Sequence, residues 1–467
     1  MNKTMRYVLG SALICMSISS MAEGVQQKPS ASTPPPPVIN CSAAQTGDSP
    51  PMPNKIDSTC ASMPKDILGS GDTQSDADQY SWLTFIAANW PVDPKTCSAD
   101  TAASILTSAQ NPTWLSFLTD DDVFVASGKP AGWCAQPTSS KSKEVAAALS
   151  AQQQSRIAQL PPVVRTLAQA HPEVRLYLHY SGKSQALVSA ASAADRPISK
   201  QLQQILDATA QPVTDQNGRF VRYAVYMNAD EYGYIKSKNL WNKAGQKAAG
   251  NLTFPSSNAS TIGAMEFKSA WKVLGKNDDP SRFFTQMAIV YNDENGSPSP
   301  GPNPVTVGLV GLHITHKTQR QPHWLWSTFE QVDNDTRSFY NPDCLAKVCP
   351  PNMETARKPY KELNSDGSPH NKPVQVVPFN KAPTNPAMNA VFQDLLKGTP
   401  WTYYKLVGTQ WEGGFGAQPK PAKLGNSVLE TFVSDTKPYS CIGCHKMAND
   451  IPANFTSDFS FIINAKQ

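Results

Sequence analysis

The middle of the chain constrains the fold most strongly, because it contains a series of short segments rich in β-branched and aromatic residues. Turn-forming stretches separate these segments, such as Asn-Asp-Asp-Pro at 277–280 and Gly-Pro-Asn-Pro at 301–304. This pattern is typical of strands that pair mainly antiparallel through short connections. We therefore predict strands over residues 220–228, 263–274, 283–292, 305–318 and 323–332, with one more over 401–411.

Helical patterns flank this region. Tyr80, Trp82, Phe85 and Ile86 recur at helical spacing before Pro91 ends the run. Further patterns predict helices over residues 143–156, 200–208 and 387–397 and a short helix over 426–433, whereas 341–386 is loop-like. The predicted fold class is α+β, with a mainly antiparallel β-sheet domain, peripheral helices and a short C-terminal segment.

The N-terminus has the pattern of a secretory signal peptide. Two cations lie within residues 1–6, an apolar run follows over 7–18, and Ser-Met-Ala at 20–22 has small residues at its ends. We predict cleavage after Ala22 and a periplasmic location. The apolar run of about 12 residues is shorter than the ~20 that span a bilayer, which argues against a retained anchor. Bulky Ile14 argues against a lipoprotein signal at Cys15.

The mature chain divides into three parts. Residues 23–76 are rich in Pro and Ser and should form an extended arm. Residues 77–425 should form the α+β domain, and residues 426–467 a C-terminal segment packed on it. No later segment has 18 uncharged apolar residues in a row, so we predict no integral membrane segment in the mature chain.

Six cysteines outside the C-terminal segment and the signal peptide form an even set, which favours disulfides in an oxidising compartment. Proximity in the sequence favours three pairs, and free buried thiols are the alternative. The pairs are Cys41 with Cys60, Cys97 with Cys134, and Cys344 with Cys349.

Charge and motifs exclude several functions. Lys+Arg 41 against Asp+Glu 37 gives a net charge of +4, far from the basic excess of a nucleic-acid-binding protein, so we expect no nucleic-acid partner. The chain has no H-E-x-x-H helix, no G-x-S-x-G elbow and no phosphate-binding glycine motif. Hydrolase and nucleotide-dependent functions therefore lose their usual support.

Residues 441–445 read Cys-Ile-Gly-Cys-His. Two thiols at this spacing add to the two vinyl groups of a porphyrin, and the adjoining histidine places its imidazole under the iron. The pattern predicts one covalent haem c on Cys441 and Cys444, with His445 as proximal iron ligand. Three other interpretations are a zinc half-site, a thioredoxin-type redox pair and a plain disulfide. A second ligand pair or a βαβ setting would favour the first two, and we find neither.

The motif resembles the attachment site of c-type cytochromes, which implies thioether bonds at Cys441 and Cys444 and iron ligation by His445. More weakly, the whole chain resembles little-characterised exported bacterial cytochrome c family proteins, in which a long β-rich region precedes a haem motif near the C-terminus. That resemblance rests on segments 81–91, 313–318, 324–334 and 458–461.

The sixth iron ligand cannot come from the residues after the motif. Met447 lies only two residues beyond His445, and the chain ends at Gln467. A ligand would therefore come from the preceding domain. His313 and His316 lie three apart in a strand and point to opposite faces, so one of them alone could meet the haem. We choose His313 as the distal ligand, with His316 and His323 as weaker candidates and a hydrogen-bonded core histidine as the alternative.

Four charged residues lie inside strand-like, otherwise apolar segments. We predict that they lie on the solvent-exposed face of alternating strands, and the alternative is that they are paired groups near a cofactor. These residues are Glu266, Lys268, Lys317 and Glu330. Trp324 and Trp326 we take as core.

Three functional hypotheses follow. The first is an exported monohaem c-type cytochrome-like protein that transfers electrons to or from a periplasmic redox partner protein. The second is a haem-dependent oxidoreductase, peroxidase- or oxygenase-like, with an open sixth iron position. The third is a haem-containing binding or sensing module. All three hypotheses describe a cytochrome c-like protein with a metal-binding centre, in which the metal is haem iron.

Overall fold

The structure is a computed structural model. It describes residues 37–47, 50–69, 73–125, 129–130, 132–134, 151–174, 176–179, 213–215, 219–291, 302–334, 339–340, 385–412, 418–430, 440–450 and 456–464. Contacts divide the chain into residues 1–37 and residues 38–467, and the helices and strands of the structure belong to the second unit. The signal peptide, the helix at 200–208, the pair Cys344–Cys349 and nearly all of the loop at 341–386 lie outside the described residues, as does the part of the predicted helix 143–156 before residue 151.

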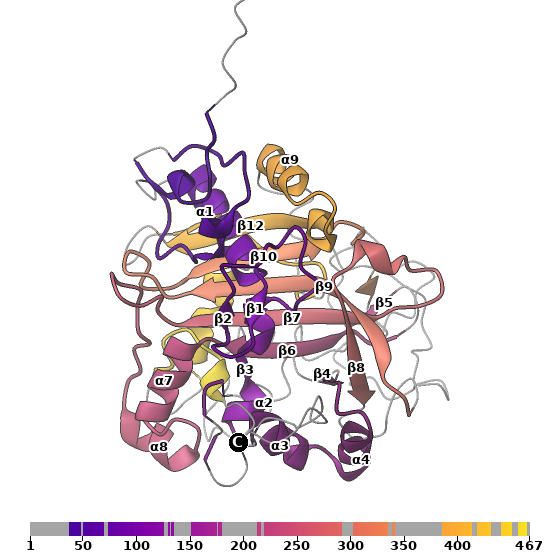
Figure 1. Ribbon diagram of the computed structural model, residues 1–467. Helices are drawn as coiled ribbons and strands as arrows, with labels where there is room; N and C mark the ends of the chain where they lie inside the picture. Colours follow the sequence, from indigo (N-terminus) through magenta and orange to yellow (C-terminus); the bar gives the residue numbers. More distant parts are fainter. Residues whose placement is uncertain are drawn as a thin grey trace, which may run out of the picture. The chain divides into compact units, whose positions relative to one another are not determined.

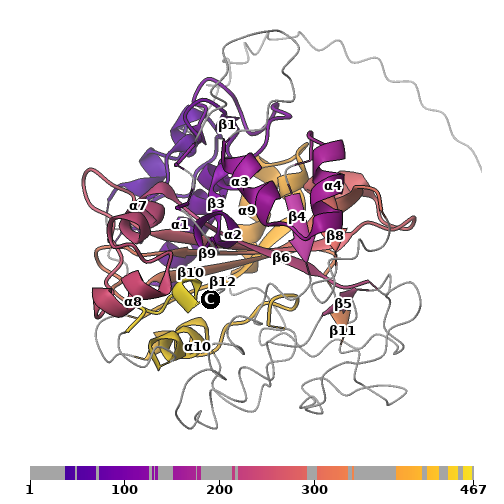
Figure 2. The same cartoon turned by 90° about the horizontal axis from the view of Figure 1, so that it is seen from below.

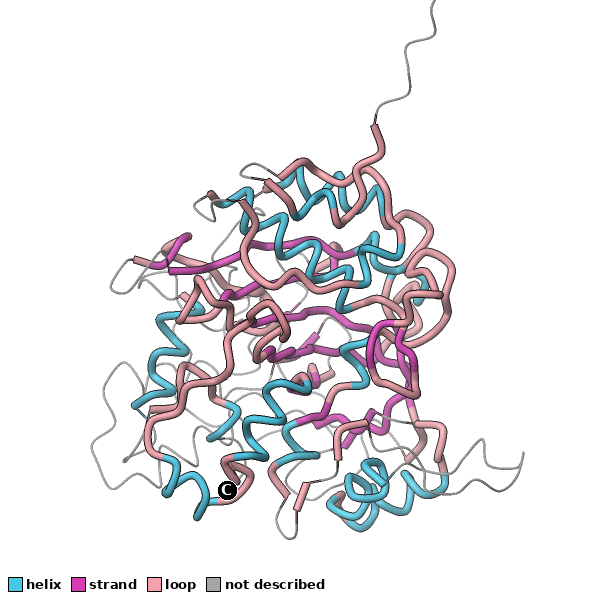
Figure 3. The backbone as a smooth tube through the Cα atoms, turned by 60° about the vertical axis from the view of Figure 1, so that its left-hand side comes forward, coloured by secondary structure: helices cyan, strands magenta, loops and turns pink. Residues whose placement is uncertain are grey.

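A nine-stranded, mainly antiparallel sheet forms the centre of this unit and confirms the predicted α+β class. Its order is β13-β12-β10-β9-β7-β6-β4-β8, with β3 paired to β6. Figure 1 shows β12, β10, β9, β7 and β6 in that order, and Figure 3 shows the strands side by side. The bounds are β3 (Leu118–Thr119), β4 (Leu176–His179), β6 (Arg222–Met227), β7 (Met265–Val273), β8 (Thr285–Tyr291), β9 (Val305–His316), β10 (Leu325–Gln331), β12 (Tyr404–Glu412) and β13 (Pro419–Lys420).

The sheet also bends back on itself at one end. Strand β8 pairs parallel with β4 and antiparallel with the start of β9, so the pairings β9-β7-β6-β4-β8-β9 close a ring. Two short two-stranded sheets lie apart from it. They are β1 (Val92–Asp93) with β2 (Ser98–Ala99), and β5 (Thr214–Asp215) with β11 (Phe339–Tyr340).

Helix α1 (Gln74–Ala88) covers one face of the sheet, which we call the helix face. Ser81 of α1 bonds Ser327 of β10 and Thr409 of β12, at 2.7 and 2.6 Å between hydroxyl oxygens. Phe85 stacks on Phe329 with ring centroids 4.3 Å apart. The main apolar core lies on this side, and its buried aromatic side chains account for the predicted periodicity of α1.

Strand alternation places the intervening residues on the opposite face, which we call the C-terminal face. In the register of β9, Gly311 and His313 lie on this face, whereas Leu312 and Ile314 lie on the helix face. Figure 2 shows α10 on the side of the sheet away from α1 to α4. The remaining helices are α2 (Asp120–Val123), α3 (Ala151–Gln159), α4 (Pro162–Ala170), α7 (Ala229–Ser237), α8 (Lys243–Ala249), α9 (Pro386–Leu395) and α10 (Cys441–Lys446).

The N-terminal arm is joined to the sheet unit from Val38 onward. It has two 3-10 turns, η1 (Ala43–Gln45) and η2 (Ser58–Ala61), and its disulfide Cys41–Cys60 is buried in the main core. The disulfide Cys97–Cys134 is present as well. Two of the three predicted pairs are therefore confirmed, while the domain boundary at residue 76 stays a prediction.

No helix within the described residues is both long enough and apolar enough to span a bilayer.

Candidate functional site

The motif at 441–445 lies on the short helix α10. The side chain of Ser440 caps the helix by accepting a hydrogen bond from the Gly443 amide at 3.0 Å. Residues i, i+3 and i+4 share one side of a helix, so Cys441, Cys444 and His445 project together. The local sequence thus brings two thiols and one imidazole to one helix side.

Helix α10 is fixed to the C-terminal face through its first turn. The Ile442 amide donates to Oε1 of Gln410 in β12 at 2.9 Å, and the Ile442 side chain is buried in a second apolar cluster with Trp326. The His445 ring lies between aromatic neighbours, with its centroid 4.1 Å from Trp326 and 4.8 Å from Phe461. Trp326 is therefore core, as predicted, and it is also the sheet residue against which the motif histidine packs.

The segment before the motif is pinned to the same face. Asn426 donates to Oγ1 of Thr328 at 2.9 Å, and the Ser427 amide donates to Oε1 of Glu330 at 2.6 Å. Gly311 makes this close approach possible, because a Cβ there would lie 2.5 Å from Cγ1 of Val428. The predicted helix at 426–433 is not formed over the described residues 426–430, which make a turn.

Cys441 and Cys444 are both free thiols and both partly exposed. Burial raises the pKa of Cys441 well above its usual range and raises that of Cys444 to about 12, with the charge of Glu430 acting in the same direction. The two sulfurs are therefore neutral at ordinary pH. A thioredoxin-type pair needs a low-pKa thiolate, so this electrostatic setting does not favour that interpretation.

His445 is held in one tautomer. Its Nδ1 lies 2.9 Å from the carbonyl oxygen of Phe459, which can only accept, so Nδ1 carries the hydrogen. Burial lowers the pKa of His445 to about 3. The ring is therefore neutral, and its Nε2 carries the lone pair that a metal ligand requires.

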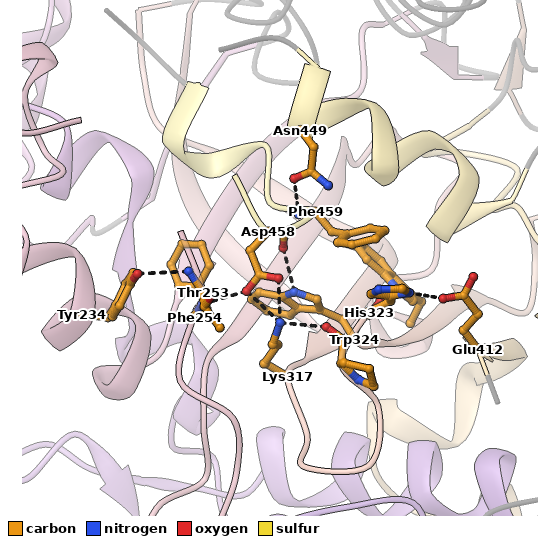
Figure 4. A network of polar contacts seen from close by, with 12 residues as sticks. Tyr234, Thr253, Phe254, Lys317, His323, Trp324, Glu412, Asn449, Asp458 and Phe459 are labelled. Carbon is orange, nitrogen blue, oxygen red and sulfur yellow. Dashed lines mark hydrogen bonds and ion pairs between the residues drawn. The ribbon is translucent and has the colours of Figure 1, made fainter. Parts of the chain in front are cut away.

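A polar network fixes the chain around the Phe459 carbonyl (Figure 4). The ion pair between Lys317 and Asp458 is its centre, with the ammonium 2.6 Å from one carboxylate oxygen. The Trp324 indole donates to the Asp458 carbonyl at 2.9 Å. Lys317 and Glu330 are both buried, so their interpretation as solvent-facing charges is wrong. The C-terminal segment covers the face on which strand alternation alone would expect water.

His313 lies on the C-terminal face, as α10 does, and His316 on the opposite face. His313 Nε2 is 3.3 Å from Oε2 of Glu430, and its cross-strand neighbours are Lys268 and Thr328. Burial lowers the pKa of Lys268. The structure thus gathers His313, Glu430 and Lys268 on the face that carries the motif.

His316 and His323 have other partners. His316 contacts the Tyr80 hydroxyl through Nδ1 and donates from Nε2 to the Ile262 carbonyl at 2.6 Å, and burial lowers its pKa to about 4. His316 is therefore a hydrogen-bonded core histidine. His323 pairs with Glu412 and stacks on Phe459 at 4.5 Å between ring centroids.

The prediction of a metal-binding centre is wrong for the part of the chain that the structure describes. There, no group of three or more His, Cys, Asp or Glu side chains could hold a metal ion. The predictions of a cytochrome, of haem and of iron thus gain no support from a cluster of side-chain ligands. The two histidines predicted as iron ligands belong to no such cluster among the described residues. His313 instead contacts Glu430, and His445 the Phe459 carbonyl.

No protein-family model, curated protein or solved structure matches this chain.

Proposed function

We propose that this protein is an exported electron-transfer protein with one haem c attached covalently to Cys441 and Cys444. One observation carries the proposal: two free thiols and a neutral imidazole with its Nε2 lone pair available share one side of α10. This donor set fits a haem, whose porphyrin supplies four of the iron's ligands, so that a cluster of side-chain ligands is not required.

Each residue of the motif has a defined task in this proposal. The neutral thiols of Cys441 and Cys444 would form the two thioether bonds, and His445 would ligate the iron through Nε2. When bound, the haem accepts and releases one electron. The Phe459 carbonyl holds the His445 ring in the required tautomer, and Trp326 limits its rotation.

The surroundings of α10 support the role of an electron carrier. Aromatic and aliphatic side chains such as Trp326, Ile442 and Phe459 form one buried cluster around the motif and keep water from its inner side. A low-dielectric setting of this kind tunes a reduction potential. The proposal includes a periplasmic redox partner protein, in line with the predicted signal peptide.

The contact between His313 and Glu430 favours a second candidate, a haem-dependent oxidoreductase. An imidazole 3.3 Å from a carboxylate, with Lys268 as its cross-strand neighbour, is a set of groups that can move a proton. In the carrier, His313 would instead be the sixth ligand of the iron.

The test is expression in a host that attaches haem c, followed by acid-acetone extraction. The wild-type protein should keep its colour and its mass should include one haem, whereas the Cys441→Ser/Cys444→Ser protein should lose both. Lys446→Gln, an exposed position on the same helix, is the matched control and should behave like the wild type. A wild-type protein without covalent haem would refute the proposal.

The absorption spectrum then separates the two candidates. A six-coordinate low-spin spectrum that His313→Ala converts to high-spin supports the carrier with His313 as ligand. A high-spin wild type whose cyanide affinity falls in His313→Ala supports the oxidoreductase. A spectrum and cyanide affinity unchanged in His313→Ala would remove His313 from the site.

A further inference from the structure

The backbone that presents a carbonyl to His445 is strained. Asp458 and Phe459 have φ angles of +52° and +68°, in the left-handed region that residues other than glycine rarely adopt. A residue in this conformation is strained and persists only where its surroundings fix it. Two in succession, directly before the carbonyl that bonds His445, indicate a backbone held in place by specific contacts.

The side chain of Asp458 supplies those contacts. Its carboxylate oxygens lie 2.6 and 2.7 Å from the Lys317 ammonium, and the two side chains are only 5% and 10% exposed. One oxygen also accepts from the Phe254 amide at 2.7 Å. Asp458 is thereby fixed to two segments far from it in sequence (Figure 4).

The backbone on either side of Asp458 is fixed as well. The Asp458 carbonyl accepts from the Trp324 indole at 2.9 Å, and the Phe459 amide donates to Oδ1 of Asn449 at 3.1 Å. Lys317 itself is oriented by the Pro322 carbonyl, to which it donates at 2.7 Å. These bonds restrain the Asp458 carbonyl and the Phe459 amide on either side of the turn, which leaves the Phe459 carbonyl one defined direction.

We propose that the Lys317–Asp458 ion pair is a positioning device that holds the Phe459 carbonyl on Nδ1 of His445 and so sets the electron-donating strength of that imidazole. Lys317 directly follows β9, so the pair connects the central sheet to the motif histidine through Asp458 and one backbone carbonyl. A buried ion pair contributes little net stability but fixes geometry, which suits this role.

The chemical consequence concerns the iron ligand and rests on the proposed function. A hydrogen bond from Nδ1 makes the imidazole a stronger donor through Nε2, which favours the oxidised metal. Loss of the bond should therefore raise the reduction potential. We expect a shift of about tenfold in the ferric–ferrous equilibrium, which is ~59 mV for one electron.

The variant that tests the ion pair is Lys317→Met with Asp458→Asn. It removes both charges, so neither charge is left buried without its partner. Asparagine tolerates the left-handed conformation, so the backbone is not blocked. The matched control is Lys272→Met with Asp278→Asn, because that ion pair is equally buried, at 2% and 10% side-chain exposure and 2.7 Å, and Asp278 bonds the Gly275 amide in the turn after β7.

The first readout needs no haem. In the full-length Cys441→Ser/Cys444→Ser background, nitrogen NMR of the histidine rings, assigned with His445→Gln, reports the tautomer of His445. We expect the Nδ1–H tautomer in the background and in the control, and a shift toward Nε2–H in the test variant. An unchanged tautomer in the test variant, or an equal change in the control, would overturn the proposal.

The second readout is the reduction potential of the haem-loaded proteins, taken with haem content and melting temperature. The test variant should have the higher potential while the control keeps that of the wild type, even where both melt at lower temperature. Equal potentials in all three proteins would overturn the tuning role. Failure of the wild type to attach haem would refute the proposed function and leave the tautomer experiment decisive for the positioning role.

Discussion

Replacement of Glu266 by glutamine should change how stability depends on pH. Glu266 lies on the C-terminal face of β7, where it accepts a hydrogen bond from Ser460 and neighbours the buried carboxyl of Glu231. Burial is the main reason that the pKa of Glu266 rises from 4.5 to about 7. The folded protein therefore keeps a proton that the unfolded chain releases.

The sign and size follow from proton linkage. A carboxyl with a raised pKa contributes stability that is fully present below about pH 4.5 and is lost as the pH rises through 7. The difference between the two pKa values, at about 1.4 kcal/mol for each pH unit, limits the loss to about 3 kcal/mol. Glutamine cannot ionise, so Glu266→Gln should gain about that much over the wild type between pH 4 and pH 8.

The assay is urea unfolding of both proteins at several pH values, with the difference in unfolding free energy plotted against pH. The amide adds a constant packing change, so only the slope of that difference is predicted. Glu173→Gln, at a side chain that is 66% exposed, controls for the loss of a surface carboxylate. A difference that is the same at pH 4 and pH 8 would refute the linkage argument.

Two further substitutions test packing and covalent structure. Gly311→Val should destabilise the protein by about 1–3 kcal/mol in urea unfolding, because its side chain would collide with Val428, whereas Gly233→Ala, where a Cβ meets nothing within 4 Å, should not destabilise it. Cys41→Ser with Cys60→Ser should cost about 3 kcal/mol, because that disulfide closes a loop with a sequence separation of 19, and an unchanged melting temperature would contradict the role of the arm in the core.

Strands were readable from the sequence because their signals are local. All six predicted strands overlap an observed one. Five contain it entirely, such as 305–318 with β9 (Val305–His316), and the sixth, 401–411, ends one residue before β12 (Tyr404–Glu412) does. The helix predicted at 426–433 is not formed over the described residues 426–430. Asn426 and Ser427 bond to Thr328 and Glu330 of β10, so long-range contacts with the sheet, which no local pattern reveals, hold the backbone of this turn.

The candidate site was readable only where its residues are neighbours in sequence. Cys441, Cys444 and His445 lie within five positions, whereas Lys317 and Asp458 are 141 residues apart and no local pattern links them. One signal was available, since residues 305–318 are apolar on both faces and a strand covered on both sides cannot expose a lysine to water. Alternation alone could not tell which segment would cover the second face.

The size of the domain before the motif has a structural explanation in β10 and β12. Trp326 and Gln410 face α10 and hold His445 and Ile442. Their sequence neighbours, Ser327 and Thr409, face the other way and are bonded to Ser81 of α1. Because adjacent residues of one strand move together, the packing of α1 on the helix face fixes the position of the motif on the C-terminal face. The sheet and the helix behind it thus form one continuous support for the motif.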